Sequence, residues 1–148
     1  MSLALVLVST ASMAHPGPEV VPPAERERAA ALAAQGPAEN RGIEDVSRLG
    51  GVDLGREFEG LAGRELRARE IVIAPGGVIG VHEHDRRPGM AYILEGEIVE
   101  HRSDAQEPLL RRAGEAAFEW SGVVHWWENR SNTPVRALVV DIVPAEAR

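Results

Sequence analysis

From residue 43 onward the chain is a succession of short apolar stretches separated by turn residues, several of them glycines. The stretches that read as strands are 66–74, 78–84, 90–94, 98–101, 109–110, 116–120, 123–128 and 135–143. Many short strands at close, even spacing are typical of an all-β sandwich or barrel. We therefore expect residues 43–148 to form one antiparallel β-barrel domain, with Pro75-Gly76-Gly77 as the hairpin turn between its first two clear strands.

The first residues of the chain read as a targeting segment. Residues 2–8 are apolar, and Ser12 and Ala14 fit the small-residue cleavage pattern of a secretory signal peptide. The usual basic opening segment is missing, because the apolar run follows Met1 directly. We expect a signal peptide over residues 1–14 and a secreted or periplasmic protein with no membrane span after its removal. The alternative is an apolar first strand or helix of the domain.

Residues 15–42 are rich in proline and alanine and are expected to form a linker with a short helical arm. A helix is predicted over 24–35, because alanine favours helix and prolines stand at its start. Gly36 and Pro37 then end it. Leu32 is its only large apolar side chain, so we expect the arm to pack loosely or to lie between subunits.

Composition excludes several kinds of function. The 148-residue chain has a net charge of −7, and its arginines are scattered among acidic residues. A nucleic-acid-binding surface needs clustered positive charge instead. The chain contains neither cysteine nor lysine, which removes disulfides, cysteine-bound metals and Schiff-base chemistry. We therefore expect no nucleic-acid partner.

Three of the five histidines fall in two of the apolar stretches. His82 and His84 are two residues apart, so on a strand both imidazoles point to one face while Glu83 points to the other. His125 lies in the later stretch Val-Val-His-Trp-Trp. Neutral imidazole is the commonest protein ligand for metals. The sequence therefore suggests a shared metal site, although a single histidine on an apolar face is more often structural.

The spacing of these residues resembles the two motifs of the cupin superfamily. The first motif is matched by a glycine, five residues, His-x-His and then a Tyr-Ile-Leu-Glu-Gly hairpin, at Gly76, His82, His84 and residues 92–96. The second is matched at Gly114, Gly122, His125 and Asn129. The resemblance covers roughly residues 66–143. It implies a cupin-type antiparallel jelly-roll barrel that holds one divalent transition metal through His82, His84 and His125.

Two positions depart from the family pattern; the first, a lost glutamate, changes the expected chemistry, and the second is a packing variation. Gly89 stands where the family places a glutamate ligand, and Trp120 replaces a proline of the second motif. The resemblance then implies a neutral three-histidine site that leaves coordination positions open for water or substrate. Asp85 is a minor alternative as an oxygen ligand. The metal is expected to be iron, zinc, nickel, copper or manganese, with iron the first candidate.

Four further residues are candidates for the site. Tyr92 and Arg87 are predicted to be catalytic, through a hydrogen bond or proton from the tyrosine and a charge from the arginine. Arg86 and Trp127 are predicted to bind substrate, since a guanidinium pairs with a carboxylate and Trp127 shares the strand face of His125. The alternatives are a packed aromatic side chain and solvated loop arginines.

The function expected from the resemblance is metal-dependent, dioxygenase-like conversion of a small oxygen-rich molecule. One alternative is a non-enzymatic module that binds a sugar or another small ligand. Another is metal-assisted isomerase or lyase chemistry on an acid sugar. We also expect a homodimer, because a barrel of this kind has exposed edge strands.

Overall fold

The computed structural model describes residues 20–31 and 35–145. The elements in chain order are α1 (Pro23–Ala31), β1 (Arg41–Asp53), the 3-10 helix η1 (Leu54–Arg56), β2 (Arg64–Glu83), β3 (Gly89–Glu95), β4 (Glu97–Arg102), β5 (Leu109–Arg112), β6 (Ala116–Glu119), β7 (Val124–Glu128) and β8 (Val135–Pro144). The predicted signal peptide lies outside the described residues. No helix of the two described ranges is long and apolar enough to cross a bilayer.

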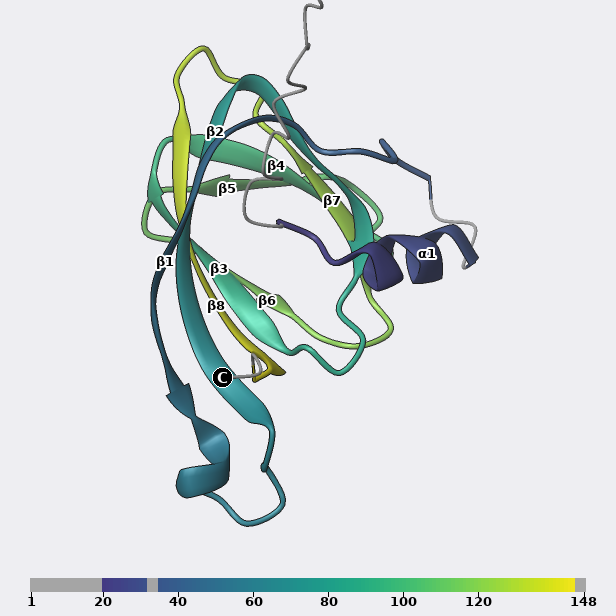
Figure 1. The fold of residues 1–148 in the computed structure, drawn as a ribbon. Coiled ribbons are helices and arrows are strands. Elements are labelled where there is room, and N and C mark those ends of the chain that lie inside the picture. The colour runs from purple at the N-terminus through teal and green to yellow at the C-terminus, as the bar shows by residue number, and fades with distance from the viewer. Residues whose placement is uncertain (1–19, 32–34, 146–148) are drawn as a thin grey trace, which may run out of the picture.

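The strands form a nearly closed antiparallel barrel, which confirms the predicted all-β class (Figure 1). Their order is β5-β4-β7-β2-β8-β3-β6, and β1 pairs with β2 along its outer side. The end of the β1–β2 pair, with η1, projects away from the barrel (Figure 1). This topology places β2 and β7 next to each other, although they lie far apart in the sequence.

The predicted hairpin turn at Pro75-Gly76-Gly77 is wrong, because β2 runs through it as one strand of 20 residues. Up to Ile73 the strand pairs with β8, and from Val78 onward it pairs with β7. Gly76 has a φ of 72°, and the register with β1 shifts at this point. Proline and glycine here mark a bend within a strand, a role they also take at sheet corners. The bend carries β2 from one wall of the barrel to the other.

Alternating side chains fill the barrel. In β8 every second residue points inward, as the buried Val135, Ala137 and Val139 illustrate. They pack with inward residues of the other strands, among them Ile73 and Ile93. Each fully buried side chain of this size stabilises the fold by about 1.5–3 kcal/mol. These apolar side chains form the main core of the barrel.

Helix α1 is docked on the barrel, which corrects the prediction of a loosely packed arm. The structure has this helix at Pro23–Ala31 and Gln35 outside it, while residues 32–34 of the predicted helix lie outside the described residues. Ala29 is fully buried against β2 and β7, and Arg28 pairs with the buried Glu83 at 2.8 Å. A small side chain lets the helix approach the sheet closely, and ion pairs supply contacts that large apolar residues would otherwise give. Figure 1 shows α1 lying across the end of β2.

Candidate metal centre

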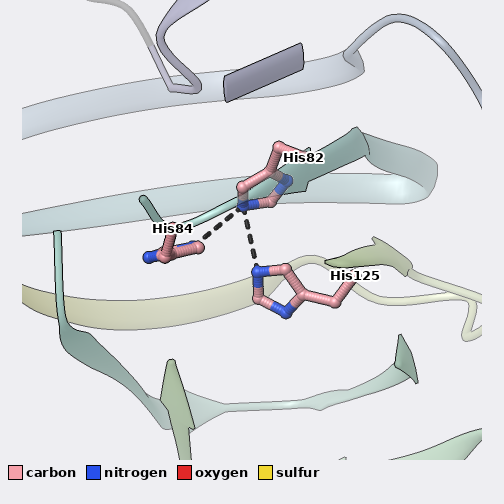
Figure 2. Close-up of side chains that lie close together, drawn as sticks. All are labelled: His82, His84 and His125. Carbon is pink, nitrogen blue, oxygen red and sulfur yellow. Dashed lines mark hydrogen bonds between the residues drawn. The ribbon is translucent and has the colours of Figure 1, made fainter. Parts of the chain in front are cut away.

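The structure brings His82, His84 and His125 together. His82 and His84 share one face of β2, and His125 of β7 is the cross-strand partner of His82. All three are buried, and their rings point toward one another (Figure 2). Nε2 of His82 lies 3.1 Å from Nε2 of His84 and 3.1 Å from Nε2 of His125. The three candidate ligand atoms all lie within 4.8 Å of one another.

The other ring nitrogen of each histidine faces an oxygen. Nδ1 of His82 lies 2.8 Å from the carbonyl oxygen of Gly80, and Nδ1 of His84 lies 3.1 Å from that of Arg87. Nδ1 of His125 lies 3.1 Å from a carboxylate oxygen of Glu100. Because these oxygens accept hydrogen bonds, the network assigns the proton to Nδ1 in each ring and leaves a lone pair on Nε2.

Three converging lone pairs repel one another unless a cation lies between them. Ligands about 2.1 Å from a metal lie about 3.0–3.4 Å apart at angles of 90–109°. The two Nε2 separations from His82, both 3.1 Å, fall in this range. The donor set therefore fits a divalent transition metal, with His82, His84 and His125 as the residues that would hold it.

Burial keeps two of these imidazoles neutral. It lowers the pKa of His82 well below its ordinary value, and the neighbouring His125 and His84 lower it further. The pKa of His84 is lowered to about 2, mainly by burial and then by the charge of Arg87. A neutral imidazole keeps its lone pair, so these side chains are ready to coordinate at neutral pH.

Glu100 supports the cluster and was not identified from the sequence. It is fully buried on β4, and besides His125 it pairs with Arg102 at 2.9 Å and Arg111 at 2.8 Å. Burial alone would raise the pKa of Glu100, but hydrogen bonds with His125 and Arg102 hold it below its ordinary value. It is therefore a carboxylate that fixes the orientation of the His125 ring. The available sequence signal was an acidic residue directly after the apolar pair Ile98-Val99.

Glu119 of β6 also faces the cluster, a position that sequence reasoning did not assign. One carboxylate oxygen lies 3.8 Å from Nε2 of His125, and the other lies 3.4 Å from Nδ1 of His84. Burial raises its pKa, although His125 and Arg87 oppose the rise. The three histidines thus have a second carboxyl group, that of Glu119, beside them.

A cavity of about 40 Å³ adjoins the histidines. Its apolar walls include Ile71, Ile93 and Trp127, and its polar end includes His82, His84, Arg69, Arg87 and Glu119. At roughly 10–15 Å³ for each water, the space holds about three water molecules. It is thus suited to a small ligand that is polar at one end.

Arg87 and Trp127, two of the predicted site residues, both line the cavity beside the histidines. Arg87 lines the cavity, with Nη2 3.4 Å from Nε2 of His84, and its guanidinium also binds Glu25 and Asp141. Trp127 also lines the cavity, edge-on to His125 with ring centroids 5.7 Å apart. Geometry thus places both side chains beside the cluster.

Three other predicted candidates are not brought to the cavity. Tyr92 is half-buried on β3 and alternates with Ala91 and Ile93, which do line the cavity, so its ring lies on the other face. Arg86 is exposed, and its backbone N–H donates to Ser121. The carboxylate of Asp85 lies 3.2 Å from Arg28 of α1. Strand register turns Tyr92 away from the cavity, and the path of the loop after His84 keeps Asp85 and Arg86 outside it.

Asn129 fixes the loop between β7 and β8. Its side-chain amide donates to the carbonyl oxygens of Ile73, Ala74 and Thr133 at 2.8–3.1 Å, and its own oxygen accepts from Ser131. Two of these carbonyls precede the bend in β2. The asparagine that closes the second motif therefore holds the bend that leads β2 to its histidines.

Comparison with known sequences identifies both a family and a relative. Residues 69–141 match the family described as Cupin domain. The chain is 37% identical over 71 residues to the "Oxalate-binding protein" of Thermotoga maritima. That match covers 48% of this chain and 57% of the relative, so the chain spans little more than half of that protein's length.

Comparison with solved structures identifies the same barrel. A Cupin 2 conserved barrel domain protein from Salinispora arenicola matches with a TM-score of 0.51 and 20% identity, over 70% of this chain and 81% of that one. An uncharacterized conserved protein with a double-stranded beta-helix domain from Klebsiella pneumoniae matches with a TM-score of 0.51 and 18% identity, over 74% and 86%. At these identities the likeness concerns the fold.

Proposed function

The chain belongs to the cupin superfamily, and we propose that it binds one divalent transition metal through His82, His84 and His125 and takes a small carboxylic acid at that metal. The observation that carries the proposal is the convergence of three buried Nε2 atoms whose partner nitrogens all face oxygens. Such a set has the composition and spacing of a metal site with open positions. Iron is the first candidate among the metals named above.

Charge and size favour an acid as the ligand. Three neutral imidazoles leave the metal's positive charge uncompensated, and the guanidinium groups of Arg87 and Arg69 line the same cavity. With a divalent metal bound, the two guanidinium groups and the metal outweigh the carboxylate of Glu119, so this end of the cavity is positive and attracts an anion. The volume of about 40 Å³ suits an acid of two or three carbons better than an aromatic ring. The relative named as an oxalate-binding protein makes oxalate the first probe.

The chain's own residues would position such an acid. A metal in this site would act as a Lewis acid toward a chelated carboxylate. Arg87 presents its guanidinium beside His84, where it can bind an oxygen of the acid. Trp127 and the isoleucines exclude water from the rest of the cavity, which strengthens both interactions.

Calorimetry with oxalate tests this proposal. We expect oxalate to bind the iron-loaded protein, and to lose at least about 100-fold in affinity when a chelator removes the metal, since binding would rest on the metal charge. Succinate, which is longer, is the size control and is expected to bind more weakly. Equal oxalate affinity with and without metal would contradict the proposed site.

Oxidative turnover of the bound acid is the second candidate function. Three protein ligands leave more than one coordination position, as oxygen-dependent iron sites require. Oxygen consumption by iron-loaded protein with oxalate supports a dioxygenase-like enzyme. Oxalate binding without oxygen consumption favours the non-enzymatic module, and acid breakdown without oxygen favours the lyase alternative.

We further propose a secreted or periplasmic homodimer. The apolar residues 2–8 support secretion, and sequencing of the mature N-terminus tests it. Exposed apolar side chains on the projecting β1–β2 hairpin, Leu49, Val52 and Phe58, support self-association. Light scattering is expected to give twice the monomer mass, and a monomer mass at high protein concentration would contradict the dimer.

A further inference from the structure

A buried carboxylate with one oxygen left unsatisfied by the described part of the chain lies beside the three histidines. Glu119 is 6% exposed, and among the described residues its Oε2 has no hydrogen-bond partner. That oxygen lies 3.4 Å from Nδ1 of His84, whose proton already faces the carbonyl oxygen of Arg87 at 3.1 Å. Buried polar atoms are nearly always satisfied in folded proteins. The Oε2 atom of Glu119 therefore calls for a cation or a hydrogen-bond donor beyond those that the described residues provide.

The position of Glu119 follows from strand register. It is the cross-strand partner of Gly89 in the β3–β6 pair, and Gly89 is in turn the partner of Asp141 in the β3–β8 pair. Cross-strand partners point to the same face of a sheet. Glu119 thus reaches the interior beside Gly89, the position at which the family motif has a glutamate.

Position 89 has no room for a side chain. A Cβ atom there would lie 2.7 Å from the carbonyl oxygen of Val140 and 2.9 Å from Cβ of Asp141. Both distances are shorter than real contacts of a Cβ atom, and the first neighbour is backbone, which cannot move aside cheaply. A carboxylate can therefore reach the cluster from β6 but not from position 89.

We propose that Glu119 is a fourth protein ligand of the metal, supplied from β6 in place of a carboxylate at position 89; this inference rests on the metal site proposed above. Its Oε1 lies 3.8 Å from Nε2 of His125. Ligand atoms lie about 3.0–3.4 Å apart, so an adjustment of about half an ångström completes the set. Side-chain rotation of a glutamate covers that shift.

The fourth ligand changes the net charge of the site and the number of coordination positions left open for a substrate. One carboxylate lowers the net charge of a divalent centre to about +1, which still attracts an anionic acid. A six-coordinate metal then keeps two positions, which suits an acid that chelates through two oxygens. Arg87 remains beside the cluster to bind that acid. The inference thus narrows the substrate class to acids that chelate with two adjacent oxygens.

Cobalt binding by Glu119→Gln tests the inference, with Glu97→Gln as the control at an exposed glutamate. Glutamine keeps the shape of the side chain but removes its charge. We expect at least a 100-fold loss of Co²⁺ affinity in chelator competition and a changed visible spectrum of the bound Co²⁺ in Glu119→Gln. Glu97→Gln is expected to match the unaltered protein in both measurements. Circular dichroism of the metal-free proteins checks that the variants are folded.

A crystal structure of the unaltered protein with cobalt provides a test that does not depend on any variant. We expect one oxygen of Glu119 about 2.0–2.2 Å from the metal. An unchanged cobalt spectrum in Glu119→Gln, or a Glu119 oxygen more than about 3 Å from a metal held by the three histidines, would overturn this inference alone. Failure of the unaltered protein to bind any cobalt would overturn the proposed function and this inference with it.

Discussion

Replacing Arg87 by methionine is expected to destabilise the domain by about 3 kcal/mol. Arg87 is 5% exposed and donates to the two carboxylate oxygens of Glu25 at 2.5 Å and to Asp141 at 2.7 Å. Methionine keeps much of the length of the side chain and removes the charge. The substitution therefore removes the cation between two buried carboxylates and little of the packing.

The size of this stability loss follows from the ion-pair partners that Glu25 and Asp141 keep after the substitution. Removing one partner of a buried ion pair costs about 3–5 kcal/mol. Asp141 keeps Arg67 at 2.9 Å and Arg69 at 3.1 Å, so most of the cost falls on Glu25. Burial already raises the pKa of Glu25, despite Arg87, so this group can take up a proton instead of remaining charged. The loss is therefore expected at the lower end of the range.

Urea denaturation measures this loss, with Arg86→Met as the matched control. Arg86 is the adjacent arginine but is exposed, so its substitution is expected to change the free energy of unfolding by less than about 0.5 kcal/mol. Adding Glu25→Gln to Arg87→Met is expected to recover about 1–2 kcal/mol, because it removes the unpaired charge. The reasoning is refuted if Arg87→Met costs less than about 1 kcal/mol and the second substitution recovers nothing.

Three further predictions test other parts of the structure. Glu100→Gln is expected to weaken metal binding about 10–100-fold in chelator competition, because it disturbs the proton on Nδ1 of His125; unchanged affinity would contradict the assigned ring orientation. Asp141→Asn tests a pH dependence. Burial alone would raise the pKa of Asp141, but Arg67, Arg69 and Arg87 hold it below the ordinary 3.8. Its stabilisation is thus present above about pH 4 and lost as the pH falls through the lower folded value, so urea denaturation should find a constant difference from the variant near pH 5–7 that shrinks in stronger acid. Asn129→Ala is expected to lower the free energy of unfolding by about 2 kcal/mol, because the carbonyl oxygens of Ile73, Ala74 and Thr133 lose a donor; a change below about 0.5 kcal/mol would contradict the role assigned to the loop.

The strands and the histidine cluster could be predicted because their signals are local or have a fixed spacing. Alternation along β8 marks its buried face without knowledge of its neighbours. His82 and His84 share a face in any strand, since side chains alternate with a period of two. Assigning His125 to the same cluster required the second motif in addition to this alternation. The placement of Trp127 beside His125 follows from the same alternation.

Features that depend on strand partners could not be read from the sequence. Proline and glycine at 75–77 suit a hairpin turn and a bent strand equally well, and only the change of partner from β8 to β7 distinguishes them. Glu119 and Glu100 reach the cluster through cross-strand register, which no single stretch encodes. The docking of α1 depends on a small Ala29 and on ion pairs with distant residues, so a search for large apolar side chains missed it.

Metal content per chain tests the central claim most directly. Purified protein is incubated with excess Zn²⁺, passed through a desalting column and analysed by mass spectrometry for bound metal. We expect about one ion per chain in the unaltered protein and in His101→Ala, whose histidine stacks on Trp126 away from the cluster, and less than about one tenth in His82→Ala. One ion per chain in His82→Ala, or none in the unaltered protein, would contradict the three-histidine metal site.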